Sequence, residues 1–163
     1  ANNDPAADYP AAVLALAATI YTNKREIAAD DFFQGLFSTA LGEADILTEI
    51  RFPKFTGWRT HYEKFNRTAQ AWSMVAVGVA LKIDGGTISE ARVGLTNMGD
   101  RPLRATAVEQ ALVGQQATAD VAKAAAAHAA EGTAAPSDAD AAADYREHLA
   151  RVLTGRAVLA AAG

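Results

Sequence analysis

The sequence contains no cysteine. This absence excludes disulfide bonds, thiolate zinc sites, cysteine-ligated iron–sulfur clusters and cysteine nucleophiles within the chain. Positive charge is also in short supply, because 15 Lys and Arg stand against 19 Asp and Glu, which gives a net charge of −4 at pH 7. No run of five or more basic residues occurs. Electrostatic binding to nucleic acid or to an anionic membrane is therefore not expected.

Long hydrophobic runs are absent as well. The longest strongly apolar stretch, residues 71–83, is interrupted by Gly78 and Lys82 and is too short to span a bilayer. Half of the 163 residues are hydrophobic, but alanine dominates that half, so we expect a core with few large side chains. The chain shows no targeting segment, and we expect a cytoplasmic protein of one ordinary domain or two small ones.

Short helices and strands are predicted in the first third of the chain. Asp8 suits the N-cap of an apolar helix that has Pro10 in its first turn. Apolar residues at helical spacing follow Asp31, and an alternating pattern ends at Pro53. The expected elements are, in order, a helix over residues 8–18, a β-hairpin over 19–29, a helix over 30–41 and a strand over 45–53.

Beyond a joint at residues 54–59 the pattern predicts a β-meander followed by helices. The alternation of Val75, Val77 and Val79 predicts a long central strand, and the sequence Asp84–Gly86 supplies a tight hairpin turn. The expected elements are strands over residues 59–65, 71–83 and 87–98, helices over 104–115 and 119–132, and a last helix from the S-x-x-D capping box at Ser137–Asp140 to about Ala162. This order is typical of a small α+β domain.

Two side chains are candidates for chemistry. Asp8 could accept hydrogen bonds from sugar or polyol hydroxyls while backbone N–H groups of the same turn face an anion, but on spacing alone a plain helix cap is the favoured interpretation. Lys64 lies between aromatic Tyr62 and Phe65 on a predicted strand, where a lone lysine is more often a solvated edge charge. The residues alone therefore indicate an α+β domain pair with a loop able to hold a hydroxylated anion, and no reaction.

Several stretches, taken together, resemble a known family. They are, in chain order, "ANNDPAADYPAAVLALAA", "DFFQGLFSTALGEADILTEIRFP", "YEKFNRTAQAWSMVAVGVAL", "ARVGLTNMGDRPLRATAVEQALVG" and "YREHLARVLTGRAVLAA". Each motif by itself is weak, but their common order over nearly the whole chain resembles the flavoprotein (medium) subunit of the molybdenum hydroxylases. The likeness is greatest to the medium subunit of the carbon monoxide dehydrogenase type.

The resemblance implies an α+β fold made of two parts. Residues 1–56 would be the second subdomain of an FAD-binding (PCMH-type) α/β domain, and residues 57–163 would be the C-terminal domain, a three-stranded antiparallel sheet with a three-helix bundle. The first FAD subdomain, with its A-G-G-x-S-type loop, and the T-I-G-G loop that precedes "ANNDPAAD" in the family are missing from this sequence. We therefore expect the chain to be a fragment of a longer subunit.

The resemblance also implies that the first loop of the chain contacts the phosphates and the ribityl chain of FAD. Asp8 matches the carboxylate that accepts hydrogen bonds from the FAD ribityl hydroxyls. Asn3 and Asp4 match positions in the loop near the phosphates. The complete subunit would bind FAD, whereas this chain by itself would bind it weakly or not at all, because the Gly-rich loops that hold the diphosphate are missing.

Further positions are implied near the flavin ring. Ile46 and Leu47 match strand residues that pack on the flavin, with backbone groups available to its polar edge. Lys64 matches a lysine that approaches the isoalloxazine, and Tyr62 is near the flavin in the same comparison. The stretch "NRTAQAW" at residues 66–72 departs from the Arg-Arg-x-x-Asp that family members often have, which affects the contacts expected of that loop.

The implied activity is that of an oxidoreductase subunit in electron transfer. FAD would pass electrons from the two 2Fe-2S clusters of a small iron–sulfur subunit to an acceptor, and a molybdopterin-binding large subunit would hold the molybdenum cofactor and the substrate. No catalytic or metal-ligating residue is expected in this chain, and the isolated fragment should be inactive. Two alternatives are a subunit-docking module that binds no flavin and a molybdenum-free flavoenzyme such as an alcohol oxidase. The second is disfavoured by the C-terminal pattern.

Overall fold

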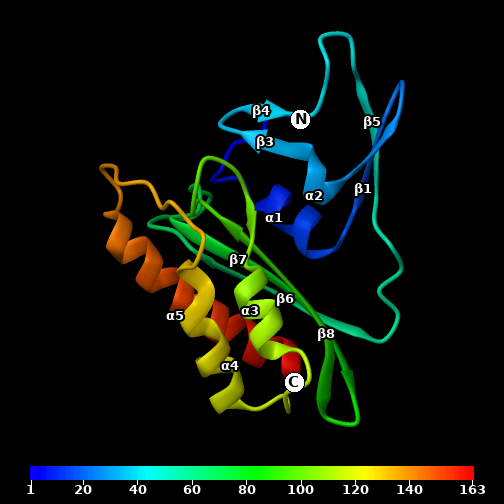
Figure 1. The fold of residues 1–163 in the computed structure, drawn as a ribbon. Helices are drawn as coiled ribbons and strands as arrows, with labels where there is room; N and C mark the ends of the chain where they lie inside the picture. Colours follow the sequence, from blue (N-terminus) through cyan, green and yellow to red (C-terminus); the bar gives the residue numbers. More distant parts are fainter.

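The computed structural model describes residues 1–163 without a break. Its elements, in chain order, are α1 (Asp8–Ala15), β1 (Thr19–Thr22), β2 (Glu26–Ala28), α2 (Ala29–Phe32), β3 (Phe33–Gly35), β4 (Ser38–Thr39), β5 (Leu47–Arg51), β6 (Trp58–Phe65), β7 (Val75–Asp84), β8 (Thr87–Thr96), β9 (Leu103–Arg104), α3 (Thr106–Leu112), α4 (Ala119–Ala126), the 3₁₀ helix η1 (Ala127–Ala130) and α5 (Ala143–Ala162). The strands form antiparallel sheets in the orders β2-β1-β5, β3-β4 and β6-β7-β8-β9 (Figure 1). No helix is both long and apolar enough to cross a membrane.

The sheet β6-β7-β8-β9 is the scaffold of the C-terminal part. Its meander was predicted from the alternating sequence, and the tight turn between β7 and β8 uses Gly85 and Gly86 at φ values of +57° and +84°, which glycine adopts without strain. Alternate residues Val75, Val77 and Val79 of β7 are buried on one face. The short strand β9, which the sequence did not indicate, extends the expected three strands by one.

Helices α3, α4 and α5 cover that buried face, as Figure 1 shows. Gly114 and Gly132 follow α3 and η1 with positive φ values, so both act as the C-terminal glycines that the sequence predicted. The helices contribute mainly alanines to the core, together with Val108, Leu112, Leu149, Leu153 and Val158, whereas the sheet contributes almost only Val, Leu and Ile side chains. An α+β fold with a sheet and three covering helices is thereby confirmed.

Helix α1 lies on the opposite face of the same sheet, against two glycines. Gly78 on β7 and Gly94 on β8 are paired across the strands and leave a trough for the helix. A β-carbon at Gly94 would lie 2.4 Å from the carbonyl oxygen of Ala11. The C-terminal end of α1 is held by Arg92, whose guanidinium donates to the carbonyl oxygens of Leu14 at 2.8 Å and Ala15 at 3.2 Å. The sheet β6-β7-β8-β9 of the C-terminal part therefore holds α1, the first helix of the N-terminal part, in place.

The predicted helix over residues 30–41 is wrong beyond its first turn. α2 ends at Phe32, and the chain continues as the β3-β4 hairpin with Leu36 and Phe37 at its tip, 60% and 59% exposed. A helix would need a second element to bury those two side chains, and none covers them. Phe37 has φ of +50°, which a helix does not allow. The helix predicted over residues 8–18 likewise stops at Ala15, and its N-cap is Ala7, so Asp8 is the first helical residue and not the predicted cap.

The predicted capping box at residues 137–140 is also wrong, because α5 begins at Ala143. The Ser137 hydroxyl does accept the Ala143 N–H at 2.9 Å. The carboxylate of Asp138 is engaged elsewhere, by two backbone N–H groups of its own turn and by the buried guanidinium of Arg146. The acidic turn therefore precedes the helix and does not form its first turn.

Candidate cofactor-binding site

The structure brings Asp8, Tyr62 and Lys64 together. The Tyr62 hydroxyl donates to Oδ1 of Asp8 at 2.9 Å, and the Lys64 ammonium donates to Oδ2 at 2.7 Å. Tyr62 and Lys64 are two residues apart on β6, so both side chains emerge on the face that carries α1. Their partners on β7 are Gly78 and Ala76, whose small size lets the first turn of α1 approach the strand. Three residues from the two parts of the chain thus form one polar cluster.

The charges in this cluster leave the Asp8 carboxylate able to accept hydrogen bonds from hydroxyl groups of a ligand. Burial, together with the Asp8 carboxylate, raises the pKa of Tyr62 well above its usual range, so the phenol remains a hydrogen-bond donor at neutral pH. An ionised carboxylate has about four acceptor positions, and Tyr62 and Lys64 occupy two of them. The Asp8 side chain is 44% exposed. Asp8 therefore retains acceptor capacity toward a ligand while Lys64 supplies a cation beside it.

The loop that leads to α1 contains an unsatisfied buried acceptor. Asn3 is 3% exposed and has φ of +53°. Its amide nitrogen donates to the carbonyl oxygens of Gly35 at 2.6 Å and Ser38 at 2.7 Å, whereas its Oδ1 has no donor. Asp4 accepts the Ala6 N–H at 3.0 Å. A buried acceptor without a donor, five residues before Asp8, is a group that a hydroxylated ligand or a further segment of chain could satisfy.

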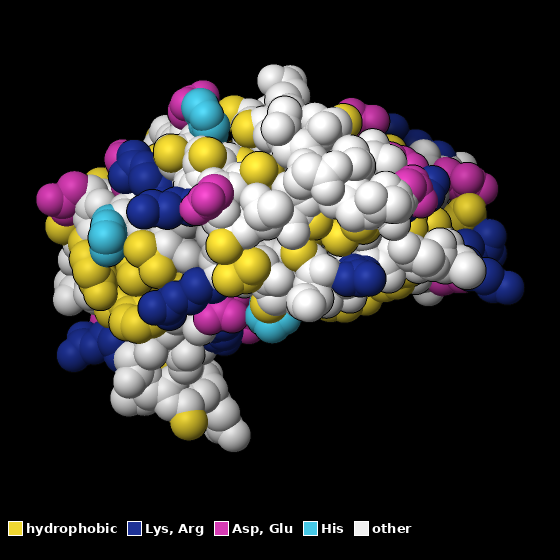
Figure 2. Space-filling model, turned by 90° about the horizontal axis from the view of Figure 1, so that it is seen from below, with side chains coloured by type: hydrophobic (Ala, Val, Ile, Leu, Met, Phe, Trp, Pro, Cys, Tyr) yellow, Lys and Arg dark blue, Asp and Glu magenta, His cyan; other side chains and the backbone are white.

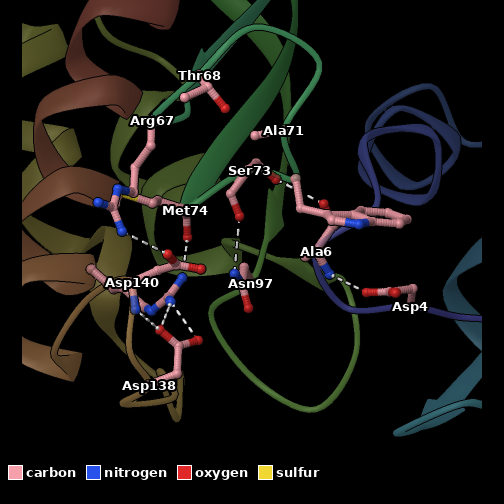
Figure 3. Close-up of a pocket in the computed structure, with 12 residues that line it drawn as sticks. Asp4, Ala6, Arg67, Thr68, Ala71, Ser73, Met74, Asn97, Asp138 and Asp140 are labelled. Carbon is pink, nitrogen blue, oxygen red and sulfur yellow. Dashed lines mark hydrogen bonds and ion pairs between the residues drawn. The ribbon is translucent and has the colours of Figure 1, made fainter.

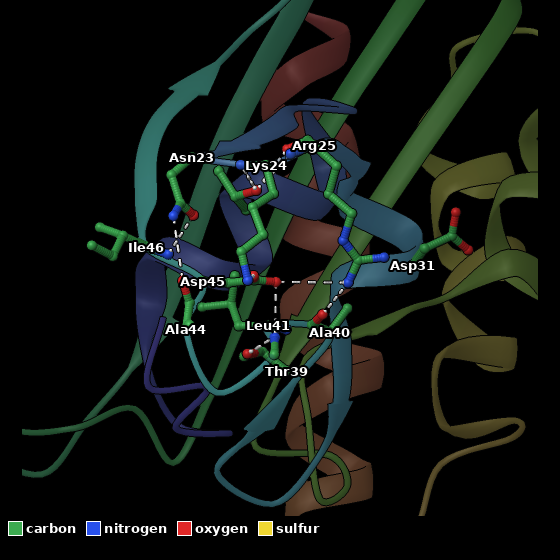
Figure 4. A network of polar contacts seen from close by, with 12 residues as sticks. Asn23, Lys24, Arg25, Asp31, Thr39, Ala40, Leu41, Ala44, Asp45 and Ile46 are labelled. Carbon is green, nitrogen blue, oxygen red and sulfur yellow. Dashed lines mark hydrogen bonds and ion pairs between the residues drawn. The ribbon is translucent and has the colours of Figure 1, made fainter.

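Ile46 and Leu47 are not part of this cluster, because no hydrogen bond or ion pair joins either residue to Asp8. Ile46 is 65% exposed, its N–H donates to the Asn23 side chain at 2.9 Å, and its carbonyl accepts the Asn23 N–H at 3.0 Å (Figure 4). The Ile46 N–H is thus occupied, whereas its carbonyl oxygen, which has two lone pairs, retains one acceptor position. Leu47 is half-buried against the small core of the first part.

Asp45 fixes the loop that carries Ile46. Its carboxylate lies 2.8 Å from the Lys24 ammonium and accepts the Gly42 N–H at 2.9 Å, as Figure 4 shows. These contacts, Lys24 foremost, lower the pKa of Asp45. The sequence analysis did not identify Asp45 or Asn23, because each is paired with residues about 20 positions away.

A cavity of about 560 Å³ opens where the N-terminal loop meets the C-terminal part (Figure 3). Its walls come from Asp4 and Ala6, from residues 67–74 and from the acidic turn before α5. Arg67 pairs with Asp140 at 3.1 Å. The stretch 66–72, which departs from the family pattern, therefore contributes a wall of this cavity.

Arg146, at the base of the cavity, is a residue that the sequence analysis missed. It is 1% exposed, and one of its amino groups donates to both carboxylate oxygens of Asp138 at 2.7 Å. Its position three residues before Leu149 on the buried stripe of α5 was the available signal, because an arginine on an apolar stripe needs a partner.

Comparison with known protein families shows to which family the chain belongs. Residues 60–161 match the CO dehydrogenase flavoprotein C-terminal domain. The chain belongs to this family. Residues 1–55 of the same chain match a second family, the FAD binding domain in molybdopterin dehydrogenase. The resemblance found in the sequence is thus confirmed, together with the fold class that it implied.

Curated relatives and a solved structure agree with this. The glyceraldehyde dehydrogenase medium chain of Sulfolobus acidocaldarius is 32% identical over 160 residues, and the carbon monoxide dehydrogenase medium chain of Afipia carboxidovorans is 37% identical over 163 residues. These alignments cover 96% and 97% of this chain and 57% of each relative. A chain of carbon monoxide dehydrogenase from Hydrogenophaga pseudoflava superposes with a TM-score of 0.94 at 35% identity over 98% of this chain and 57% of that one. The flavoprotein-family chain therefore spans somewhat more than half the length of the relatives it matches.

Proposed function

We propose that the protein to which this chain belongs is the FAD-binding, electron-transferring subunit of a molybdenum hydroxylase. In this proposal residues 1–56 are part of the FAD-binding domain and residues 57–163 are the C-terminal domain. The partners would be a molybdopterin-binding large subunit and a small subunit with 2Fe-2S clusters. FAD would release to an acceptor the electrons that the clusters deliver. The family match and the absence of cysteine ligands in this chain support this division of labour.

The observation that carries the proposal is the Asp8–Tyr62–Lys64 cluster. Bound FAD supplies the redox chemistry, and the residues here supply binding and charge. Asp8 would accept hydrogen bonds from ribityl hydroxyls, and Tyr62 and Lys64 hold its carboxylate in place through contacts of 2.9 and 2.7 Å. Lys64 would place a positive charge near the ring, whereas Asn3 and Asp4 would lie near the phosphates. Ile46 and Leu47 would add apolar contact.

The names of the two relatives indicate different substrates, glyceraldehyde for one and carbon monoxide for the other. Chains of similar sequence thus belong to enzymes with different substrates. This supports the view that the substrate is selected outside the present chain. A flavin-free docking module, the competing function, would leave the Asp8 cluster without a ligand.

Replacing Asp8 with alanine in the complete subunit should weaken FAD binding about tenfold or more, because a charged acceptor of hydroxyl donors contributes roughly 1.5–3 kcal/mol. Flavin occupancy after purification and the equilibrium dissociation constant of FAD measure the effect. Asp8→Glu should restore part of the affinity, since it keeps the carboxylate.

The matched control is Asp31→Ala, which removes an exposed carboxylate that makes no side-chain hydrogen bond. It should leave FAD affinity unchanged. Equal occupancy in the Asp8→Ala and Asp31→Ala proteins would show that Asp8 does not hold FAD and would favour the docking module.

Lys64→Met should lower the reduction potential of the bound flavin. The substitution removes the cation near the ring and leaves the negative charge of Asp8 without its compensating cation, so added negative charge on the flavin is less stabilised. A loss of about 1.4 kcal/mol corresponds to roughly 30 mV for a two-electron couple. Potentiometric titration of the complete subunit gives the value. A double variant, Lys64→Met with Asp8→Asn, should recover part of the shift, and an unchanged flavin couple in Lys64→Met would refute the assigned role.

A further inference from the structure

The outer surface of the helix layer carries a groove between α4 and α5. Its volume is about 480 Å³. It lies on the side of the sheet opposite α1 and Asp8, because α5 packs on the buried face of β7 whereas α1 packs on the glycine face. Its lining residues are Ala119, Lys123 and Ala126 from α4, Ala127 from η1, and His148, Arg151, Val152, Gly155, Arg156 and Leu159 from α5.

The spacing of these residues matches the surface that a third helix would need. Successive lining positions on α5 are separated by three, one, three, one and three residues, which is one continuous helical face. The stretch from residue 148 to 159 extends about 17 Å, or three turns. At its centre Gly155 faces Ala126, and a β-carbon on Gly155 would lie 3.5 Å from that of Ala126. Because these two residues are small, the backbone of another helix could approach the groove closely at this point.

The charge of the groove points to an acidic occupant. Lys123, Arg151 and Arg156 border it, and of these only Arg151 pairs with a carboxylate, that of Glu147 at 3.1 Å. The chain as a whole has a net charge of −4, so this surplus of cations is local. On the face that Figure 2 shows, hydrophobic atoms gather in patches beside Lys and Arg side chains. Leu159, in the floor, is 48% exposed.

We propose that the α4–α5 groove binds an acidic amphipathic helix of a partner protein. About three turns of that helix would place apolar side chains at i, i+3 or i+4 and i+7 on the floor, where Val152 and Leu159 meet them. Its Asp and Glu residues would face Lys123 and Arg156 across the rim. The interaction is separate from the flavin site, so variants of the groove should leave FAD content unchanged.

Photo-cross-linking tests the proposal in the complete subunit, expressed together with the products of its neighbouring genes. Val152 is replaced by p-benzoylphenylalanine, the sample is irradiated, and mass spectrometry identifies the attached peptide. We expect a peptide from another protein with the acidic amphipathic pattern. The same photoreactive residue at the exposed position Lys54, outside the groove, should not capture it.

A second measurement uses a synthetic copy of the captured peptide and fluorescence anisotropy. Reversing the rim charges with Lys123→Glu and Arg156→Glu should weaken its binding at least tenfold at low salt, whereas Lys54→Glu should not. Thermal unfolding and FAD content show that the variants remain folded. Capture of a second copy of this chain, of a basic or non-helical segment, or of nothing overturns the proposal, and so does binding that charge reversal does not change.

Discussion

Replacing Asp138 with alanine is expected to lower the free energy of unfolding by about 3 kcal/mol. The substitution leaves the guanidinium of Arg146, which is 1% exposed, with the Met74 carbonyl oxygen at 2.6 Å as its remaining partner. Breaking a buried ion pair from one side costs roughly 3–5 kcal/mol, and the partial exposure of Asp138 places the effect at the lower end. Urea unfolding of wild type and variant measures the difference.

The same turn offers a matched control. Asp140→Ala removes an equal charge two residues away, but its partner Arg67 is exposed, so the loss should be about 0–1 kcal/mol. Adding Arg146→Met to Asp138→Ala removes the orphaned charge and should recover much of the stability. Equal losses for Asp138→Ala and Asp140→Ala would show that Arg146 does not depend on its carboxylate.

The contribution of Asp138 should depend on pH. Hydrogen bonds from the Ala141 and Asp140 N–H groups and from Arg146 lower the pKa of Asp138 below its ordinary value of 3.8. A carboxyl with a depressed pKa stabilises the folded state above the unfolded pKa, and that contribution is lost as the pH falls through the folded pKa. The difference in unfolding free energy between wild type and Asp138→Ala should therefore be constant near neutrality and shrink in acid.

Elements with strong periodicity could be predicted from the sequence. The alternation in β7, the glycine turn at residues 85–86 and the glycines after α3 and η1 each specify local structure by themselves. The helix expected at residues 30–41 failed because its apolar spacing fits a helix only if both Leu36 and Phe37 are buried. Burial is a tertiary property, and local spacing does not determine it.

The candidate site shows the same limit more sharply. Asp8 is 54 residues from Tyr62 and 56 from Lys64, so nothing in local spacing brings them together. Only the family resemblance named all three, and the packing of α1 on the glycine face of the sheet explains why they meet. Arg146 could have been flagged as a polar residue on an apolar stripe, but its partner Asp138 had been assigned to a helix cap that does not form.

The position of α1 therefore depends on the absence of a side chain at Gly94, and Gly94→Ala should be as damaging as the loss of Asp138. The added methyl would lie 2.4 Å from the Ala11 carbonyl oxygen, a backbone atom that cannot move without displacing the helix. Overpacking of this kind costs about 1–3 kcal/mol, and we expect the upper end, near 3 kcal/mol, in urea unfolding.

Gly78→Ala is the control, because Gly78 pairs with Gly94 and lies under the same helix. Its β-carbon would lie 3.4 Å from a ring carbon of Tyr62, 3.5 Å from the β-carbon of Ala15 and 3.7 Å from the Ala11 carbonyl oxygen, which are all ordinary contacts. Its effect should stay within about 1 kcal/mol. Displacement of α1 also separates Asp8 from Tyr62 and Lys64, so Gly94→Ala should reduce both stability and FAD occupancy in the complete subunit. Asp8→Ala should reduce occupancy alone. A Gly94→Ala protein that is as stable as wild type and keeps its flavin would show that the helix is not seated on the sheet by this contact.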